Sequence, residues 1–449
     1  MKEKNQLELF ESGKVSTAVL KNAIPAMIAM LMVLVYNLAD TFFIGQTHDD
    51  LQVAAVAMCT PVFLIFMSVG TVFGLGGTSV ISRAFGAGRA EYAKKVSSFC
   101  MWSGVTIGVV MAAVFLIFMD QVLTIMGVSA DIWEYAKTYM VIVTISGPFV
   151  IISNCFSGIL RAEGQANTSM TGMLIGNIAN IILDPIMIIA FGWEIAGAAI
   201  ATVIGNILSG GYYLLYFRKG TSMLSINPKD FSMKEGICKN VVAIGIPAAL
   251  GSLLMSVSQI LLNNQMINYG DMAVAGMGVS SKIMMITGMV CIGLGQGVQP
   301  LLGYCVGARN WERFKKALYI SLGFAFAISV VMTGLCYLLT EQIVSVVLTN
   351  PEAFDYGCRF ARVLLTTSIF FGVYYVLVNT LQAMGAATPS FIINLSRQGI
   401  IFIPSLYILE ALLGLDGLLW AQPVVDILSL ILAIAMYIPI YRKMVRTAK

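Results

Sequence analysis

The sequence predicts an all-α integral membrane protein with twelve transmembrane helices, and three observations support this fold class. Hydrophobic residues make up 58% of the 449 positions and charged residues only 11%, whereas a soluble domain carries about 25% charged residues. Apolar stretches of about 18 residues or more, which is enough to cross a bilayer, recur along the whole chain. The connections between these stretches alternate in charge.

The charged connections set the order and orientation of the predicted helices. In the first half, acidic connections follow the first, third and fifth helices, and basic ones follow the second, fourth and sixth. The second half has acidic connections after its first, third and fifth helices as well. Because short cytoplasmic loops are rich in Lys and Arg, we expect both the N- and the C-terminus to be cytoplasmic. The predicted helices cover residues 15–43, 52–82, 93–119, 132–160, 167–191, 195–217, 238–267, 272–304, 314–339, 352–382, 388–410 and 416–441.

An internal repeat relates the two halves of the chain. GLGGTSVISRAFGAGR at 74–89 matches GLGQGVQPLLGYCVGAR at 293–309, and GILRAEGQANTS at 158–169 matches NTLQAMGAATPS at 379–390. Matched positions lie 219 to 222 residues apart. Since each half holds six helices and starts on the same side of the membrane, we expect two parallel six-helix lobes related by an axis along the membrane normal.

The longest polar connection gives the predicted lobe boundaries. We expect an N-terminal lobe at 1–217, a cytoplasmic linker at 218–237 and a C-terminal lobe at 238–449. Repeats of this kind occur in transporters that work by alternating access, with the path of the solute between the lobes. A channel can also be built from repeats, so the repeat alone does not exclude one.

Polar side chains at a similar depth on three helices form a candidate site in the N-terminal lobe. At about 1.5 Å per residue along a helix, Asp40, Asp184 and Thr202 all lie in the outer half of the membrane. Side chains three, four or seven residues apart share one face of a helix. The shared faces hold Tyr36, Asn37 and Asp40; Asn177, Asn180 and Asp184; and Thr202 and Asn206.

A charged group at this depth in the membrane costs free energy, and it usually has a functional role. Desolvation favours the neutral form of a carboxyl group, and a second carboxylate nearby adds to the effect. The two acids could therefore hold a proton, or bind Na⁺ together with amide oxygens. The alternative is that these groups only join the helices by hydrogen bonds. Pro185, directly after Asp184, is expected to kink the helix because it lacks a backbone donor.

Other polar residues allow two interpretations each. Lys282, Arg397 and Asp426 lie near mid-membrane in the C-terminal lobe, where Asp426 either neutralises one of the two bases or belongs to a second coupling or gating element. Glu163 lies in the loop after the fourth helix, where it is either simple surface polarity or a gating group. The candidate substrate-binding residues are Tyr36, Asn37, Asn177, Asn206 and Glu163.

Five segments carry a resemblance to a known family: IPAMIAMLMVLVYNLADTFFIG (24–45), GTSVISRAFGAGR (77–89), RAEGQ (161–165), NIANIILDPIMI (177–188) and GAAIATVIGN (197–206). Together they resemble the multidrug and toxic compound extrusion (MATE) family, and the resemblance covers essentially the whole chain. It implies a twelve-helix antiporter that exports lipophilic cations in exchange for H⁺ or Na⁺. Because the acids lie in the N-terminal half, the chain looks most similar to the bacterial DinF and MepA-like branch. That branch implies ion coupling at Asp40, Asn180, Asp184 and Thr202.

Several function classes are excluded or disfavoured. The chain has no GxxxxGK[ST] phosphate loop, and its single histidine gives no catalytic or metal-binding arrangement. We therefore expect no enzyme, no metal, no cofactor besides the coupling H⁺ or Na⁺, and no nucleic-acid partner. The expected partners are amphipathic cations and the lipid bilayer, and the expected state is a monomer in the bacterial cytoplasmic (inner) membrane. The main alternative is a flippase for lipid-linked saccharides, whose cavity would be lined by Arg and Lys.

Overall fold

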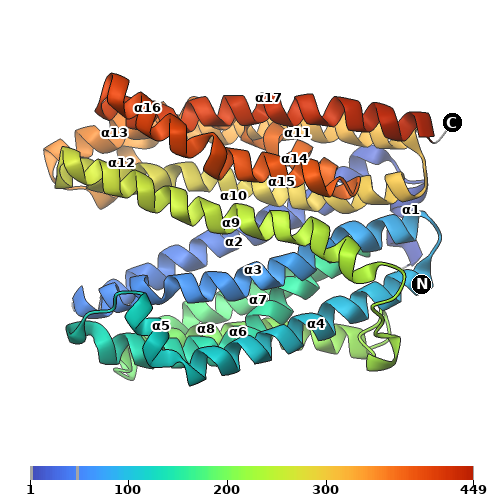
Figure 1. Cartoon of the computed structure of the whole chain (residues 1–449), viewed down its shortest axis with the longest axis horizontal. Coiled ribbons are helices and arrows are strands. Elements are labelled where there is room, and N and C mark those ends of the chain that lie inside the picture. Colours follow the sequence, from blue (N-terminus) through green and yellow to red (C-terminus); the bar gives the residue numbers. More distant parts are fainter. Residues whose placement is uncertain (1–3, 47–49, 448–449) are drawn as a thin grey trace. The chain divides into compact units, whose positions relative to one another are not determined.

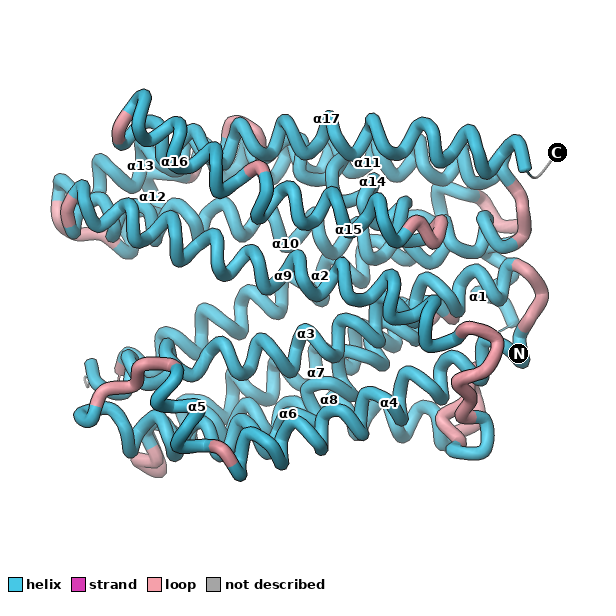
Figure 2. The backbone as a smooth tube through the Cα atoms, in the orientation of Figure 1, coloured by secondary structure: helices cyan, strands magenta, loops and turns pink. Residues whose placement is uncertain are grey.

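The computed structural model of the chain describes residues 4–46 and 50–447, and every regular element in these ranges is helical (Figures 1 and 2). Twelve helices are long and apolar enough to span a membrane, which confirms the predicted fold class. They are α2 (Val15–Gly45), α3 (Asp50–Gly86), α4 (Ala90–Ile117), α6 (Trp133–Ala162), α7 (Ala166–Asp184) continued by the π-helix η2 (Pro185–Ala190), α8 (Glu194–Arg218), α9 (Ile237–Met266), α10 (Asp271–Gly307), α11 (Trp311–Leu338), α13 (Pro351–Leu365) continued by α14 (Phe371–Ala383), α15 (Ala387–Leu395) continued by α16 (Phe402–Leu413), and α17 (Leu415–Thr447).

The chain divides into two compact units. Unit 1 consists of Met1–Glu8 and Leu31–Gly245, and unit 2 consists of Leu9–Met30 and Ile246–Lys449. The division falls inside α2 and α9, each of which carries a proline in its interior, Pro25 and Pro247. The predicted lobe boundaries at 217 and 238 stay a prediction.

Unit 1 is built around α6. This helix packs against α3, α4, α7 and α8, which run side by side with it in Figure 1. Small residues bring the helices close: a Cβ on Gly158 of α6 would lie 2.5 Å from the backbone oxygen of Gly74 of α3. The hydroxyl of Thr78 then donates to the oxygen of Gly158 at 2.8 Å. The short helix α5 (Met119–Ile125) leads from α4 towards α6.

Unit 2 is built around α10 and α17. Helix α10 packs against α11, α13 and α14, and α17 packs against α13, α14 and α16. The sequence predicted one helix at 352–382, but the structure divides it into α13 and α14, with a short 3₁₀ turn between them. The backbone N–H of Gly372 donates to the hydroxyl of Ser329 on α11 at 3.0 Å. That contact supplies a partner for a backbone donor that has no partner within α14, at the start of the helix. The hydropathy pattern of a single long helix cannot show such a break.

The connection between α8 and α9 is fixed to the end of α4. Ser97 and Ser98 donate to the backbone oxygens of Ser225 and Asn227, both at 2.7 Å. Trp102 donates its indole N–H to the oxygen of Ile226 at 3.1 Å. These bonds satisfy three successive backbone oxygens of an extended segment, so the linker is an ordered part of unit 1.

Candidate functional site

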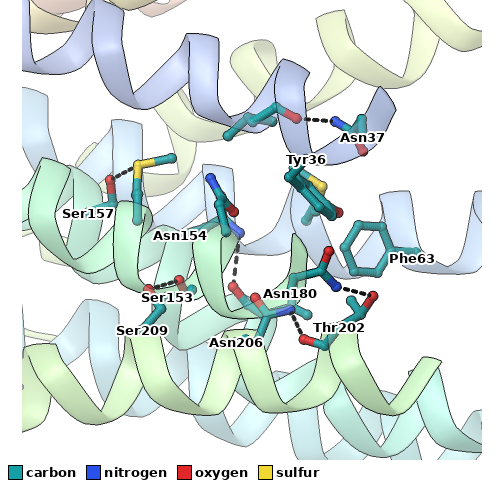
Figure 3. A pocket seen from close by; sticks show the side chains of 17 residues that line it. Tyr36, Asn37, Phe63, Ser153, Asn154, Ser157, Asn180, Thr202, Asn206 and Ser209 are labelled. Carbon is teal, nitrogen blue, oxygen red and sulfur yellow. Dashed lines mark hydrogen bonds between the residues drawn. The ribbon is translucent and has the colours of Figure 1, made fainter. Parts of the chain in front are cut away.

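A cavity of about 90 Å³ lies within unit 1, among α2, α3, α6, α7 and α8 (Figure 3). Pockets for drug-sized ligands measure roughly 300–1,000 Å³, so at this size the cavity has room for a few water molecules or an ion, and a drug-sized cation would need it to widen. Its walls carry amide, hydroxyl and aromatic groups. They consist of Val33, Tyr36, Asn37, Phe63, Met67, Val150, Ser153, Asn154, Ser157, Met173, Gly176, Asn177, Asn180, Thr202, Gly205, Asn206 and Ser209.

Helical spacing brings the polar groups of α7 and α8 onto the cavity wall. On α8, Thr202, Asn206 and Ser209 follow each other by four and three residues and share one face. The side-chain amide of Asn206 donates to the backbone oxygen of Thr202 at 2.9 Å. Ser209 reaches α6, where its hydroxyl lies 2.8 Å from that of Ser153. The bond between Ser209 and Ser153 therefore joins α8 to α6 at the cavity wall.

Asn180 joins this wall to an acidic residue. The Asn180 side-chain nitrogen lies 3.2 Å from the Thr202 hydroxyl. A dashed line marks this hydrogen bond in Figure 3. When the Asn180 amide is turned so that its oxygen faces Thr202, that oxygen accepts from the Thr202 N–H at 3.1 Å and from the hydroxyl at 3.2 Å, and the amide nitrogen donates to Asp184 Oδ2 at 3.1 Å. This orientation satisfies both ends of the amide. Asn180 then links the cavity to the carboxylate of Asp184.

The two predicted acids, Asp40 and Asp184, lie beside the cavity. Asp184 is fully buried, and Oδ1 of each acid is buried without a hydrogen-bond partner. A buried charged oxygen without a partner is unfavourable, so each of these oxygens favours a bound proton or cation. The arrangement can therefore hold a proton, or a cation that prefers oxygen ligands.

Pro185 shapes the backbone beside Asp184. Instead of a simple kink, the structure shows a change from α-helix to π-helix at Pro185. Ile188 in this π-helix packs against Ile44 of α2 and Ala198 of α8. Because Ile44 lies one turn after Asp40, this contact holds the two acids near each other. Short π segments are often found at functional sites.

The structure brings most of the predicted N-terminal site residues together. Tyr36, Asn37, Asn177, Asn180, Thr202 and Asn206 line the cavity. Glu163 does not line it. This residue is buried at the end of α6, where its carboxylate accepts from the hydroxyl of Ser222 at 2.7 Å and from the backbone N–H of Met223. Its carboxylate thus fixes the linker and makes no contact with the cavity.

In unit 2, two of the three predicted charges form an ion pair. Arg397 donates to Asp426 Oδ1 from Nε at 3.0 Å and from Nη2 at 2.9 Å. The same carboxylate accepts from Gln422 at 2.9 Å and from Thr367 at 3.3 Å. Lys282 is exposed on α10, and it shares no hydrogen bond or ion pair with Arg397 or Asp426 in the part of the chain that the structure describes.

The side chains that α3 and α6 contribute to the cavity were not predicted from the sequence. Phe63 and Met67 come from α3, and Ser153, Asn154 and Ser157 come from α6. The signal for the second set was present, because these three polar residues lie one and four positions apart in an otherwise apolar stretch. Phe63 and Met67 carried no such signal, since apolar residues on a membrane helix face lipid or protein alike.

Comparison with known proteins matches this architecture to a transporter family. The family model MatE matches residues 25–186 and again residues 247–408. Each match has the same length, in agreement with the internal repeat.

Relatives and solved structures cover nearly the whole chain. The multidrug export protein MepA of Staphylococcus aureus (strain MSSA476) is 32% identical over 431 residues, which is 95% of this chain and 94% of that protein. MepA of Staphylococcus haemolyticus (strain JCSC1435) is 31% identical over the same share of each chain. Among solved structures, a MOP superfamily transporter from Pyrococcus furiosus has a TM-score of 0.91 at 25% identity and covers 99% of both chains. An outward-facing multidrug resistance MATE transporter has the same TM-score and identity over 98% of both chains.

Proposed function

This chain belongs to the MatE family of transporters, and we propose that it is a secondary antiporter that exports amphipathic organic cations in exchange for H⁺ or Na⁺. It is a multi-pass protein of the bacterial cytoplasmic membrane. Its similarity to MepA, a multidrug export protein, supports drugs and related cations as the substrate class.

The observation that carries the proposal is the pair of acids beside the cavity. Asp40 and Asp184 each hold a buried oxygen without a hydrogen-bond partner. Asn180 connects Asp184 to Thr202 on the cavity wall. Binding of an ion at the acids can therefore change the hydrogen bonds of the wall directly. That is the physical requirement for exchange of an ion against a cationic substrate.

The proposed cycle follows from this coupling. A cation enters from the cytoplasmic side, and the lobes rock to expose it to the outside. A proton or Na⁺ then binds at Asp40 and Asp184 and neutralises their charge, which weakens attraction for the cationic substrate and promotes its release. A ligand shifts such an equilibrium only by its difference in affinity for the two states, so the ion must bind the releasing state more tightly.

The composition of the cavity argues against the flippase alternative. A site for a lipid-linked pyrophosphate needs Arg or Lys, because these side chains pair with phosphate oxygens. None of the cavity-lining residues of unit 1 is Arg or Lys. The one buried arginine near mid-membrane in unit 2, Arg397, is already paired with Asp426.

Ethidium efflux from proteoliposomes tests the proposal. The purified protein is reconstituted, and a pH gradient and a Na⁺ gradient are imposed separately, with a gradient-free sample as the control. The proposal expects efflux that follows one of the two gradients and identifies the coupling ion. Efflux that is indifferent to both gradients would contradict antiport.

A further inference from the structure

Residues around the cavity of unit 1 have counterparts at equivalent positions of the repeat in unit 2. Gly164 and Gly385 each have a positive φ, +85° and +76°, and each precedes the fifth helix of its half. Gly197 of α8 packs directly on the backbone of Met187, and Gly417 of α17 packs in the same way on the backbone of Leu409. The offset is 221 residues where the fifth helices begin, 222 at Met187 and Leu409, and 220 where the sixth helices begin. Unit 2 thus gains one residue within its fifth helix, which contains a π-helix over residues 396–400. The offset of 221 from the start of that helix pairs Gly176 with Arg397.

Six residues that line the cavity of unit 1 correspond to six residues that contact one another in unit 2. The unit 1 residues come from α6, α7 and α8, and their counterparts come from α14, the π-helix η6 (Ser396–Ile400) and α17. Val150, Ser153, Asn154, Gly176, Thr202 and Asn206 correspond to Phe371, Tyr374, Tyr375, Arg397, Gln422 and Asp426.

In unit 2 this place is occupied by the guanidinium of Arg397. Its central carbon lies 4.8 Å from the ring centre of Tyr374, 5.2 Å from that of Phe371 and 5.5 Å from that of Tyr375. Nη1 also donates to the hydroxyl of Tyr375 at 3.1 Å, and Nε and Nη2 donate to Asp426. Three aromatic faces and a carboxylate form the environment that binds an organic cation.

Unit 1 has glycine at the equivalent position, so no side chain enters the cavity from there. Gly176 is in contact with the backbone of Gly205, so a Cβ on Gly176 would lie 2.8 Å from the oxygen of Gly205. The equivalent of Asp426 is Asn206, an uncharged amide. One unit therefore has a cavity whose lining holds no cationic side chain, and the other has a cationic side chain paired with its own carboxylate.

We propose that Arg397 is a tethered cation that permanently occupies in unit 2 the position that unit 1 keeps open for mobile ligands. As a result, Asp426 binds no exchangeable ion. Ion exchange is confined to the Asp40–Asp184 site, a consequence that rests on the function proposed above. The proposal also assigns a latent binding site: without the Arg397 side chain, Asp426 and the three aromatic rings form a site for a small guanidinium or ammonium cation.

Thermal unfolding in detergent tests the latent site without any transport assay. The proteins are the wild type, Arg397→Ala and the double variant Arg397→Ala with Asp426→Asn, each heated with 10 mM guanidinium chloride or with 10 mM NaCl. Guanidinium binding to the folded state alone should raise the melting midpoint of Arg397→Ala by about 3 °C over NaCl. The wild type, whose site is filled, and the double variant, whose site has lost its carboxylate, should show no such difference. Equal shifts in all three proteins, or none in Arg397→Ala, would overturn the proposal.

The double variant keeps the test decisive if Arg397→Ala does not accumulate as folded protein. An unpaired buried Asp426 is strongly unfavourable, and its replacement by Asn removes the need for a cation. The yield of monodisperse protein should then recover in the double variant. A double variant as poorly folded as the single one would show that Arg397 serves packing alone, and would overturn the proposal. Neither result depends on efflux, so a failure here is distinct from a failure of the antiporter proposal.

Discussion

Gly176 of α7 and Gly205 of α8 are in direct backbone contact. A Cβ on Gly205 would lie 2.7 Å from the oxygen of Gly176, and one on Gly176 would lie 2.8 Å from the oxygen of Gly205. Backbone atoms cannot move aside as a flexible side chain can, so any larger residue separates the two helices. This close approach sets the distance between Asn180 and Thr202, which lie on the same two helices and join the cavity to Asp184.

Replacing Gly205 should therefore lower the stability of the protein against unfolding. Replacing another glycine of the same helix should not. Gly205→Ala should destabilise the protein by about 1–3 kcal/mol through overpacking. Gly211→Ala is the matched control, because a Cβ at Gly211 meets nothing within 4 Å and alanine is the better helix former. Thermal unfolding of the two variants measures the difference. Equal melting midpoints would contradict the role of the glycine contact.

The hydroxyl of Thr202 should be needed both for stability and for gradient-driven efflux. Thr202→Val keeps the shape of the side chain but removes the partner of the Asn180 amide at 3.2 Å. The Asn180 oxygen keeps its hydrogen bond to the backbone N–H of residue 202, and the loss of the one to the hydroxyl costs about 0.5–1.5 kcal/mol. Thr202→Val should therefore melt at a lower temperature and lose most gradient-driven efflux. Thr202→Ser, which keeps the hydroxyl, should retain both properties. A Thr202→Val protein with wild-type efflux would remove Thr202 from the coupling site.

Tyr36 should contribute its ring to the binding of cationic substrates, because it lines the cavity wall. A cation–π contact of this kind is worth about 1 kcal/mol or more. Tyr36→Leu should therefore raise the apparent KM for ethidium by roughly five-fold or more, whereas Tyr36→Phe should leave it close to the wild-type value. Initial efflux rates over a range of dye concentrations give both constants. Equal KM values for the Leu and Phe variants would contradict this contact.

Helix-level features could be predicted from the sequence because they depend on hydropathy along the chain. The twelve spans, Asp40, Asp184 and the polar faces of the helices that carry them all follow from apolar length and helical spacing. The sequence also showed Pro185 as a point of irregular backbone, but not that the irregularity is a π-helix. The break between α13 and α14 was missed because its 366–370 segment has no proline or charge to interrupt the apolar run.

The sequence could not show how each helix is rotated about its own axis, and therefore which side chains face a neighbouring helix. Lys282 and Arg397 lie at a similar depth along their helices, yet Arg397 is buried against Asp426 and Lys282 is exposed. Depth counts residues along one helix, whereas contact depends on how that helix is turned toward its neighbours. Glu163 was placed correctly in a loop, but its contacts with Ser222 and Met223 join segments about 60 residues apart. No local pattern reports such a contact.

The central claim is that the buried acids of unit 1 couple ion movement to export, and one pair of variants tests it most directly. Asp184→Asn removes the charge with little change in volume. Asp120→Asn removes an exposed acid that pairs with Lys137 at 2.8 Å on the surface, where an ion pair contributes little. Ethidium efflux is measured in proteoliposomes under the gradient that drives the wild type. We predict that Asp184→Asn is folded and inactive while Asp120→Asn transports like the wild type. Gradient-driven efflux by a folded Asp184→Asn protein would contradict the claim.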